Sequence, residues 1–572
     1  MKIRFAVILV GGSSVAFAQL PFTPVDTSYY TQTVVIPAIP FKYNVLFEGK
    51  MDTVYTATSF ALAKQTQDYI GFYPLGNGDD SALLVVNHEI TSLRDSVLGD
   101  GGGMTCFKIV KTNNDWNAVP DANGKTYHNV DFSGVGGTNI NCGGGTTPYG
   151  KFLTAEEFPV NSNTLLHLSG SGFQDTSDYL ILPGNGSYSG RTLKKYQQMG
   201  WITQIDAITA QAEKKFYGMG RFAHEAALCM DDGKTVYLTE DATPGFFYKF
   251  IADHVNDYTS GQLYAYQQGM NGIGGSWIVL PMDLDSLIVI NTIALRKGAT
   301  GFSRLEWMKK ANGKIYFSES GHDVGDYKTA WQYGMPAAHH IRLDTVYGTT
   351  QDSILSDYYG RVLEFDTFTH TLRSYLEGGF SSDGKTVFSN PDCLTAVIQN
   401  GTTYLVIHED IIGTGFGRSP SGNTICEVFY LDLGITNPVV DDLHRFMVGP
   451  IDAETTGGCF SPDGKTYFVN IQHPSPNNIP PFNNTVTLAV SGFNLLTQVP
   501  AVRSIGSKIT VYPNPANRIL YLSEKTDADL YNTEGQQVLS AKNLSRIDVA
   551  GLTPGSYFLK MADGEVIKIV VE

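Results

Sequence analysis

The chain has 572 residues, a formal net charge of −16 and only 17% charged residues. An acidic surface disfavours nucleic acid and anionic membranes as partners, although bound cations can still attract an anionic substrate. Glycine accounts for 60 residues and aromatic residues for 12%, which is typical of short strands joined by tight turns and excludes a coiled coil or a disordered chain.

The N-terminus has the pattern of a secretory signal. Its first residues are basic, residues 5–10 are apolar, and Ala16-Phe17-Ala18 is a small-residue cleavage site. The apolar run is far shorter than the ~20 residues that a membrane span needs. We therefore predict that residues 1–18 are a signal peptide that is removed, and that the mature chain has no transmembrane segment.

A hairpin motif recurs through the middle of the chain. Asp-Gly or Asn-Gly is followed each time by a strand of alternating β-branched and aromatic residues, a strong hairpin signal because type I′ turns need positive φ. The copies lie at 231–241, 311–320, 382–390 and 462–471, with looser copies at 150–157 and 400–410. Repeated strand units predict an all-β fold, a β-propeller of about six blades with insertions.

Several of these strands end in acidic residues, namely Glu89, Glu156-Glu157, Glu240-Asp241 and Glu409-Asp410. Equivalent positions of propeller blades face one central channel, so we expect these carboxylates to converge. Clustered carboxylates raise each other's pKa unless a cation neutralises them, and their oxygen atoms suit Ca²⁺. The alternative is that each acidic pair faces solvent in a loop.

Residues 141–157 contain a glycine-rich stretch, N-C-G-G-G-T-T-P-Y-G-K-F, that lets the backbone approach a ligand closely. It contains G-x-x-x-x-G-K, but Phe152 stands where a P-loop needs Ser or Thr, which excludes a nucleotide P-loop. We interpret Cys142 as a thiolate that faces a metal. The other five cysteines are widely spaced, and we expect most of them to be buried as small apolar residues.

The last residues, 508–572, differ in sequence pattern from the preceding chain and follow a predicted linker at 496–507. Their short alternating strands predict a small C-terminal β-sandwich. They resemble the type A sorting domain of the type IX secretion system at 512–516, 535, 551–560 and 568–571. The resemblance implies a route through the periplasm, the secretion machinery as a partner, and a final place outside the cell or on its outer surface. An adhesive β-module is the alternative.

Ordered motifs between residues 40 and 480 resemble the PhoX-type family of alkaline phosphatases. They lie at 141–157, 200–206, 220–226, 302–306, 390–394 with 407–410, and 454–474. We therefore expect residues 19–495 to form a PhoX-like propeller. The resemblance implies a six-bladed propeller that holds an iron–calcium cluster and hydrolyses phosphate esters outside the cytoplasm.

The resemblance also assigns roles to individual residues. Cys142, Glu225 and Glu306 would hold the metal cluster, and Arg304 would bind the phosphoryl oxygens. Further metal ligands are expected at Glu89, Glu157, Asp392 and Glu409. A thiolate with carboxylates suits iron, carboxylates alone suit calcium, and the arginine fork matches phosphate. The alternative for Arg304 is a structural salt bridge with Glu306.

The sequence departs from the family pattern at several places. Ala155 stands where the family often has Cys, and Cys393 stands where Asn is usual. Trp307 replaces the usual Gly after Glu306, so we expect a narrower pocket. Tyr149 and Phe152 replace tryptophans, which is a change of packing.

These observations predict a secreted, monomeric, metal-dependent phosphomonoesterase that binds a phosphate-ester substrate and no nucleic acid. Trp307 and Ala155 motivate an alternative, a non-catalytic propeller that binds calcium for stability and acts as a surface binding module. Another propeller hydrolase, such as a calcium-dependent phytase or a lactonase, is a third hypothesis. No G-x-S-x-G serine motif is present.

Overall fold

In the computed structural model the chain divides into two compact units, residues 1–494 and 495–572. The structure describes residues 20–26, 28, 30–76, 80–90, 95–163, 177–269, 274–321, 359–411, 425–493, 511–512, 514–532, 536–561 and 566–571. The predicted signal peptide and linker lie outside the described residues, so the boundaries at 18, 495 and 507 stay predictions. In the described part, no helix has the length and apolar character needed to cross a bilayer.

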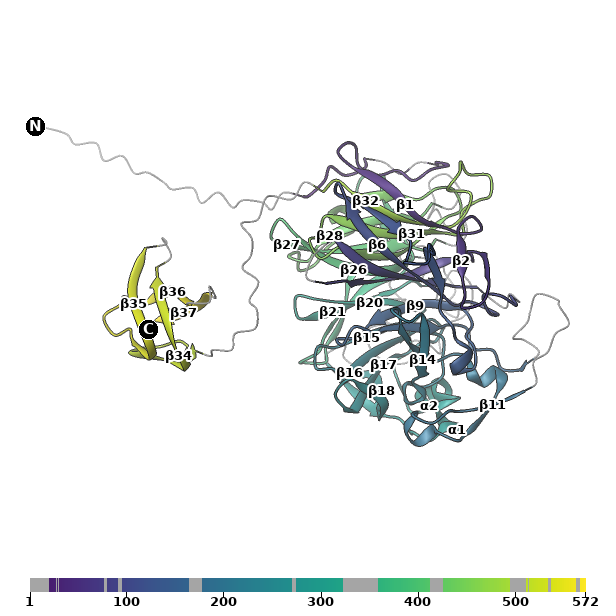
Figure 1. Ribbon diagram of the computed structural model, residues 1–572, viewed down its shortest axis with the longest axis horizontal. Helices are drawn as coiled ribbons and strands as arrows, with labels where there is room; N and C mark the ends of the chain where they lie inside the picture. The colour runs from purple at the N-terminus through teal and green to yellow at the C-terminus, as the bar shows by residue number, and fades with distance from the viewer. Residues whose placement is uncertain are drawn as a thin grey trace, which may run out of the picture. The chain divides into compact units, whose positions relative to one another are not determined.

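The first unit consists mostly of antiparallel sheets (Figure 1). We name each large sheet by its innermost strand, and give its strands in sheet order. The β4 sheet contains β4 (Gln67–Pro74), β5 (Ser81–His88), β6 (Met104–Thr112), β8 (Tyr127–Asn129), β2 (Thr53–Tyr55) and β3 (Phe60–Leu62), with β7 (Asp115–Val119) on β6. The β9 sheet contains β9 (Asn141–Thr146), β10 (Phe152–Glu156), β13 (Ile202–Asp206) and β14 (Gln211–Lys215). The β15 sheet contains β15 (His224–Cys229), β16 (Thr235–Glu240), β17 (Phe247–His254), β18 (Asp257–Gln268) and β19 (Gly275–Val279).

The remaining large sheets follow the same plan. The β20 sheet contains β20 (Leu305–Ala311), β21 (Lys314–Glu319), β22 (Arg361–Asp366) and β23 (Leu372–Glu377). The β26 sheet contains β26 (Pro391–Gln399), β27 (Thr402–Glu409), β28 (Glu427–Asp432) and β29 (His444–Val448). The β30 sheet contains β30 (Glu454–Phe460), β31 (Thr466–Gln472), β32 (Val486–Ser491) and β1 (Lys42–Glu48). It therefore joins strands from both ends of the unit.

Smaller elements fill the connections. Two-stranded sheets pair β11 (Asp178–Leu180) with β12 (Thr192–Lys194), and β24 (Gly379–Phe380) with β25 (Val387–Phe388). Two short helices, α1 (Leu284–Leu287) and α2 (Ile290–Arg296), follow β19. Short 3-10 helices lie at Ser133–Val135, Gly186–Tyr188, Lys195–Gln198, Tyr217–Met219 and Val440–Asp442.

The six innermost strands form a closed circle. Each of β4, β9, β15, β20 and β26 contacts the inner strand of the next sheet along the chain, and β30 contacts β4. Large apolar side chains fill the space between neighbouring sheets; Phe247, Phe317 and Phe365, for example, pack together between the β15 and β20 sheets. The second strands are buried on both faces, as β31 shows along its whole length. This arrangement is a propeller-like fold, as expected.

The predicted hairpins are confirmed. Asn312-Gly313 joins β20 to β21 and Asn400-Gly401 joins β26 to β27, with positive φ at all four residues as a type I′ turn requires. The copies at 150–157, 231–241 and 462–471 also supply the turn into the second strand of a large sheet. The copy at 382–390 differs, because it forms the separate hairpin of β24 and β25.

The second unit is one curled antiparallel sheet of β33 (Val511–Tyr512), β34 (Ile519–Tyr531), β35 (Gln537–Asp548), β36 (Gly555–Met561) and β37 (Val566–Val571). We expected two stacked sheets, but β34 pairs with β35, β33 and β36 in turn. Register shifts along β34 allow this long strand to bend around an apolar core. The small β-module is therefore confirmed, and its strands belong to a single sheet.

Candidate metal centre

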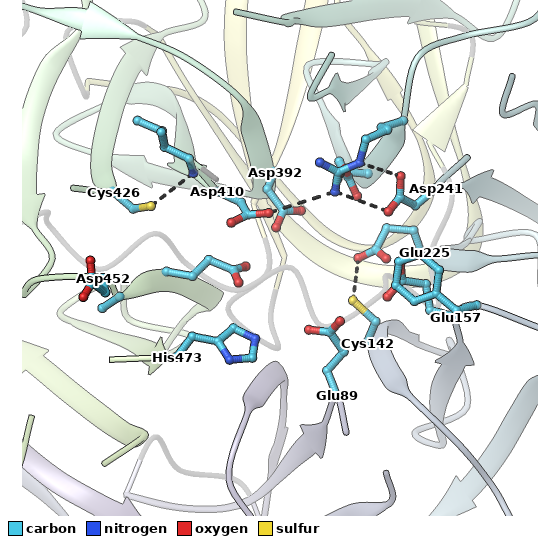
Figure 2. A pocket seen from close by; sticks show the side chains of 16 residues that line it. Glu89, Cys142, Glu157, Glu225, Asp241, Asp392, Asp410, Cys426, Asp452 and His473 are labelled. Atoms are coloured by element: carbon cyan, nitrogen blue, oxygen red, sulfur yellow. Dashed lines mark hydrogen bonds and ion pairs between the residues drawn. The ribbon is translucent and has the colours of Figure 1, made fainter. Parts of the chain in front are cut away.

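A cavity of about 440 Å³ opens where the inner strands begin. Figure 2 shows carboxylates and the thiol of Cys142 reaching into it from different sheets. Glu89, Cys142, Glu157 and Glu225 lie on one side and Asp410 on the other. Its charged, thiol and imidazole lining consists of Glu89, Cys142, Glu157, Glu225, Asp241, Arg304, Glu306, Asp392, Asp410, Cys426, Asp452, Glu454 and His473. One carboxylate of each predicted acidic strand end therefore reaches the cavity, while Glu156, Glu240 and Glu409 do not line it.

One register explains how the inner strands supply these groups. In each large sheet, the last residue of the second strand pairs with a residue near the start of the inner strand. The residue that follows this partner along the inner strand belongs to a set that we call the first ring. Its members are Asp68, Cys142, Glu225, Glu306, Asp392 and Thr455. Four of these line the cavity, and Asp68 lies behind Cys142.

A β-bulge accompanies the first ring. In five sheets the register shifts at the ring residue, so that two inner-strand residues oppose one residue of the second strand. In the β30 sheet the shift comes slightly later, between Thr456 and Cys459. A bulge re-aims a side chain that a regular strand would place on the other face. The bulges thus turn the ring residues toward the axis.

The loops after the second strands supply a second ring, Glu89, Glu157, Asp241, Ser320, Asp410 and His473. All but Ser320 line the cavity, and Ser320 donates a hydrogen bond to Glu306 Oε1 at 2.7 Å.

The strand-end glutamates before second-ring members point into their own sheets, whereas Gln472 donates to Glu89 Oε2 of the neighbouring sheet at 2.6 Å. Glu156 pairs with Lys215 at 2.7 Å, and Glu319 pairs with Arg361 at 2.6 Å, all fully buried. Three strand ends, those of β10, β16 and β27, thus place one carboxylate inside the sheet and the next in the cavity.

Donor atoms gather in four groups, each within 4.8 Å. The groups are Asp68–Cys142–Glu225, Glu89–Cys142–Glu157, Glu225–Glu306–Asp392 and Asp392–Asp410–Glu454. Two contain a thiol and carboxylates, and two contain carboxylates alone. These donor sets suit a transition metal and a hard cation respectively.

The electrostatics favour bound cations. Burial and neighbouring carboxylates raise the pKa values of Asp68, Glu157, Glu225, Glu306 and Glu454 well above their usual range. Burial raises the pKa of Glu89 to about 7 and of Asp392 to about 8. Buried oxygens without a hydrogen-bond partner among the described residues are Asp68 Oδ1, Glu157 Oε2, Glu225 Oε2 and Asp392 Oδ1. Oxygens left unpaired in a like-charged cluster fit cation ligands.

Cys142 sits between carboxylates. Its Sγ lies 2.7 Å from Asp68 Oδ2 and 3.2 Å from Glu225 Oε1. Burial and these neighbours raise the pKa of the thiol well above its usual range. A bound cation reverses this effect, since a coordinating thiol loses its proton.

Arg304 is the only Arg or Lys side chain lining the described cavity. It adopts positive φ, and its Nε and Nη2 contact Asp241 Oδ1 and Glu306 Oε1, each at 3.0 Å. Asp410 Oδ2 lies 4.0 Å from Nη2. Burial alone would lower the pKa of Arg304, but these carboxylates outweigh it and raise the pKa. The salt bridge with Glu306 is therefore present.

The structure brings seven of the eight predicted site residues together in the cavity. They are Glu89, Cys142, Glu157, Glu225, Arg304, Glu306 and Asp392. Glu409 does not line it, because its carboxylate accepts hydrogen bonds from the N–H groups of Ser389 at 2.8 Å and Glu427 at 3.1 Å. As a strand-end residue it faces the sheet, and its neighbour Asp410 enters the cavity instead.

The assignment of site residues left out Asp68, Asp241, Asp410 and Glu454, which all line the cavity or belong to its candidate metal-binding groups. Asp241 and Asp410 were already among the acidic strand ends expected to converge, but they were not assigned as ligands. Asp68 has no such signal in the sequence.

Trp307 does not narrow the cavity, contrary to our expectation. It is buried below the lining residues, with its ring 5.7 Å from that of Tyr69. Since β4 and β20 are three steps apart in the circle of six inner strands, these rings meet across the axis. Trp307 and Tyr69 follow the first-ring residues Glu306 and Asp68, and they form a layer beneath the lining residues that we call the floor.

Comparison with known proteins agrees with this geometry. Residues 22–475 match the family described as Alkaline phosphatase PhoX, and residues 510–572 match the Secretion system C-terminal sorting domain. The chain belongs to the PhoX alkaline phosphatase family and carries a C-terminal sorting domain, which indicates secretion. No curated protein sequence matches the chain.

Solved structures support the fold. PhoX from Pseudomonas fluorescens in complex with vanadate, a transition state analogue, is 21% identical with a TM-score of 0.60, over 83% of this chain and 98% of that one. A gluconolactonase from Xanthomonas campestris is 9% identical with a TM-score of 0.27, over 77% and 97%. A B. megaterium levansucrase mutant is 11% identical with a TM-score of 0.29, over 79% and 89%. Only the first likeness is close enough to show a shared fold.

Proposed function

We propose that the protein is a secreted, metal-dependent phosphomonoesterase that releases phosphate from phosphate esters. The observation that carries this proposal is the cavity, where carboxylates from all sides surround one arginine. An anionic phosphate would be repelled there unless cations occupied the carboxylates, because like charges interact strongly in a buried site. Family membership supplies the reaction class.

The donor sets suggest where cations bind. Cys142 with Asp68 and Glu225 would hold iron, and the groups made of carboxylates alone would hold calcium. When bound, these ions would act as Lewis acids on the phosphoryl oxygens. Each large sheet would be one blade of a six-bladed propeller, an interpretation that the closed circle of inner strands supports.

Arg304 would orient the substrate. Its guanidinium is fixed by Asp241 and Glu306, so it keeps one geometry at little entropic cost when an anion binds. Its planar fork fits two phosphoryl oxygens, which a lysine cannot match. The same two contacts would also suit a purely structural arginine, which favours the second candidate, a non-catalytic propeller that binds calcium for stability.

The test uses the full secreted protein. We expect bound iron and calcium by elemental analysis and hydrolysis of p-nitrophenyl phosphate that a chelator abolishes. Cys142→Ala and Glu306→Gln should each lose several orders of magnitude in kcat, because each removes a metal ligand. Cys229→Ala and Glu213→Gln, which lie outside the cavity, serve as matched controls.

The outcomes separate the two candidates. Calcium without iron, together with no phosphate release from the parent, favours the non-catalytic propeller. Variants of Cys142 and Glu306 that hydrolyse the ester as fast as the parent would refute the assignment of the site.

A further inference from the structure

Fully buried polar side chains on the second strands reach across to the next sheet. Asn87 donates to the carbonyl oxygens of Cys142 at 2.6 Å and Gly143 at 2.8 Å. Thr239 donates to the carbonyl oxygen of Glu306 at 2.6 Å. Each donor belongs to one sheet, and each acceptor belongs to the sheet that follows it in the circle.

The same contact recurs around the circle. Ser318 donates to the carbonyl oxygen of Asp392, and Asn470 donates to that of Asp68. His408 Nδ1 lies 2.8 Å from the carbonyl oxygen of Thr455. In all five cases the acceptor is the main-chain oxygen of a first-ring residue. We name Asn87, Thr239, Ser318, His408 and Asn470 the donor ring; all are fully buried.

The sixth junction is built differently, with no side-chain donor to its first-ring carbonyl among the residues that the structure describes. Ala155 lies on β10 opposite the two bulged residues of β9, the position that a donor occupies in other sheets. Its methyl group cannot donate a hydrogen bond to the carbonyl oxygen of Glu225. Here the inner strands β9 and β15 approach closely instead. A Cβ on Gly143 would lie 1.9 Å from the carbonyl oxygen of Glu225. Direct backbone contact therefore replaces the side-chain hydrogen bond at this junction.

The bulges explain why donors are needed. At four of the five acceptors, all but Thr455, a bulge interrupts the ladder of backbone hydrogen bonds at the first ring, in the interior of the protein. A buried carbonyl without a partner is costly, so the structure must supply one from elsewhere. A donor on the neighbouring sheet satisfies this carbonyl and also fixes the orientation of the peptide. The orientation of the peptide in turn sets where the ring side chain points.

We propose that the donor ring consists of positioning residues, each of which fixes the main chain of a first-ring residue in the next sheet and so couples neighbouring sheets, at five of the six junctions, into one metal-binding unit. The inference rests on the proposed function only where it concerns cations. The backbone part stands on the hydrogen bonds alone. Asn87 would position Cys142, Thr239 would position Glu306, and Ser318 would position Asp392.

The first test measures positioning without metal. Thr239→Val replaces the donating hydroxyl by a methyl group of the same size, and Thr203→Val is the matched control because its buried hydroxyl has no partner among the described residues. Thr239→Val removes the hydrogen bond to the carbonyl oxygen of Glu306 and also the acceptor of the Ala226 N–H, at 3.1 Å in its own sheet. In chelator, we expect amide hydrogen exchange in the peptide containing Glu306 to be about 10-fold faster in Thr239→Val, from the loss of the first of these bonds. Equal exchange in both variants overturns the inference.

The second test measures the consequence for cations. Calcium is titrated against the full protein while its melting temperature is followed. Thr239→Val should need about 10- to 100-fold more calcium than the parent, the cost usual for an outer partner of a metal ligand. Thr239→Ser should restore the parent value, since it restores the donor. If Thr239→Val and Thr203→Val titrate alike, the positioning role is wrong.

The two tests distinguish failure of the inference from failure of the function. A parent that calcium does not stabilise contradicts the proposed metal site, while the exchange rates still decide the role of the donor ring. Ser318→Ala is a second variant that only removes atoms. It should affect the Asp392 segment in the same way if Thr239→Val does not fold, and unchanged exchange there overturns the inference.

Discussion

Adjacent carboxylates at the end of β27 have opposite surroundings. Glu409 accepts one backbone N–H bond from Glu427 in its sheet and one from Ser389 just before β26, while Asp410 faces the cavity next to Asp392 and Glu454. The separation arises because consecutive residues of an extended chain point in opposite directions. One residue therefore stabilises the sheet, and the next would contribute to cation binding at the proposed site.

This difference predicts opposite effects of two similar substitutions. Asp410→Asn should weaken calcium binding but leave the metal-free protein equally or more stable, because it removes a charge from a repelling cluster. Glu409→Gln should destabilise the metal-free protein by about 1–3 kcal/mol, since its amide group cannot accept both N–H bonds. Urea unfolding in chelator and calcium titration measure the two effects. An Asp410→Asn protein with parental calcium affinity would contradict the site.

The bulged inner strands place two kinds of residue side by side. In β4 and β20 the bulge presents a carboxylate, Asp68 or Glu306, and then an aromatic ring, Tyr69 or Trp307. The carboxylates belong to the metal-binding groups, and the rings close the axis beneath them. One local irregularity thus builds both the wall and the floor of the site.

We expect the floor to matter for stability. Trp307→Gly, which inserts the residue that the family resemblance expects, should lower the free energy of unfolding by about 3–5 kcal/mol because it leaves a large buried void. Trp307→Phe should cost less, since it keeps a ring against Tyr69. Urea midpoints in chelator provide the comparison. A Trp307→Gly protein as stable as the parent would show that the ring contact contributes little.

Local sequence signals predicted the elements well and the bulges poorly. Asn312-Gly313 and Asn400-Gly401 specify their hairpins through backbone conformation, which depends on two residues. A bulge depends instead on packing between sheets, and no residue type marks it. For this reason Cys142, Glu225 and Glu306 were found through their motifs, whereas Asp68 was missed. Glu409 was chosen over Asp410 because a one-residue change of register exchanges the two faces of a strand.

At the scale of the whole molecule, the acidic cavity couples stability to pH and cations. Burial raises the pKa of Glu89 to about 7 and of Asp392 to about 8, above the values of an unfolded chain. At these two groups, the metal-free folded state therefore binds more protons than the unfolded state between pH 5 and 8. The contribution of these two groups to the free energy of unfolding is therefore greatest at low pH, and it is lost as the pH rises through their folded pKa values.

This linkage predicts that calcium stabilises the protein more at pH 8 than at pH 5. The ion binds the ionised carboxylates, so it relieves a repulsion that protons relieve at low pH. Melting temperatures with calcium and with chelator, measured at each pH, give the difference directly. The buried histidines, such as His224 with a pKa lowered to about 3, also make stability depend on pH. At a given pH their contribution is the same with calcium and with chelator, so it cancels in the difference. A calcium effect that is independent of pH would contradict the cluster.

The β30 sheet has a consequence for how the chain is made. Lys42 pairs with Ser491, so the last sheet takes its outer strand from the beginning of the propeller and the rest from its end. Early sheets can assemble while synthesis continues, but β1 must wait, unpartnered, until β32 has been translated. Incomplete chains therefore expose free strand edges, the feature that promotes aggregation. Export before folding would keep that vulnerable interval away from the crowded cytoplasm.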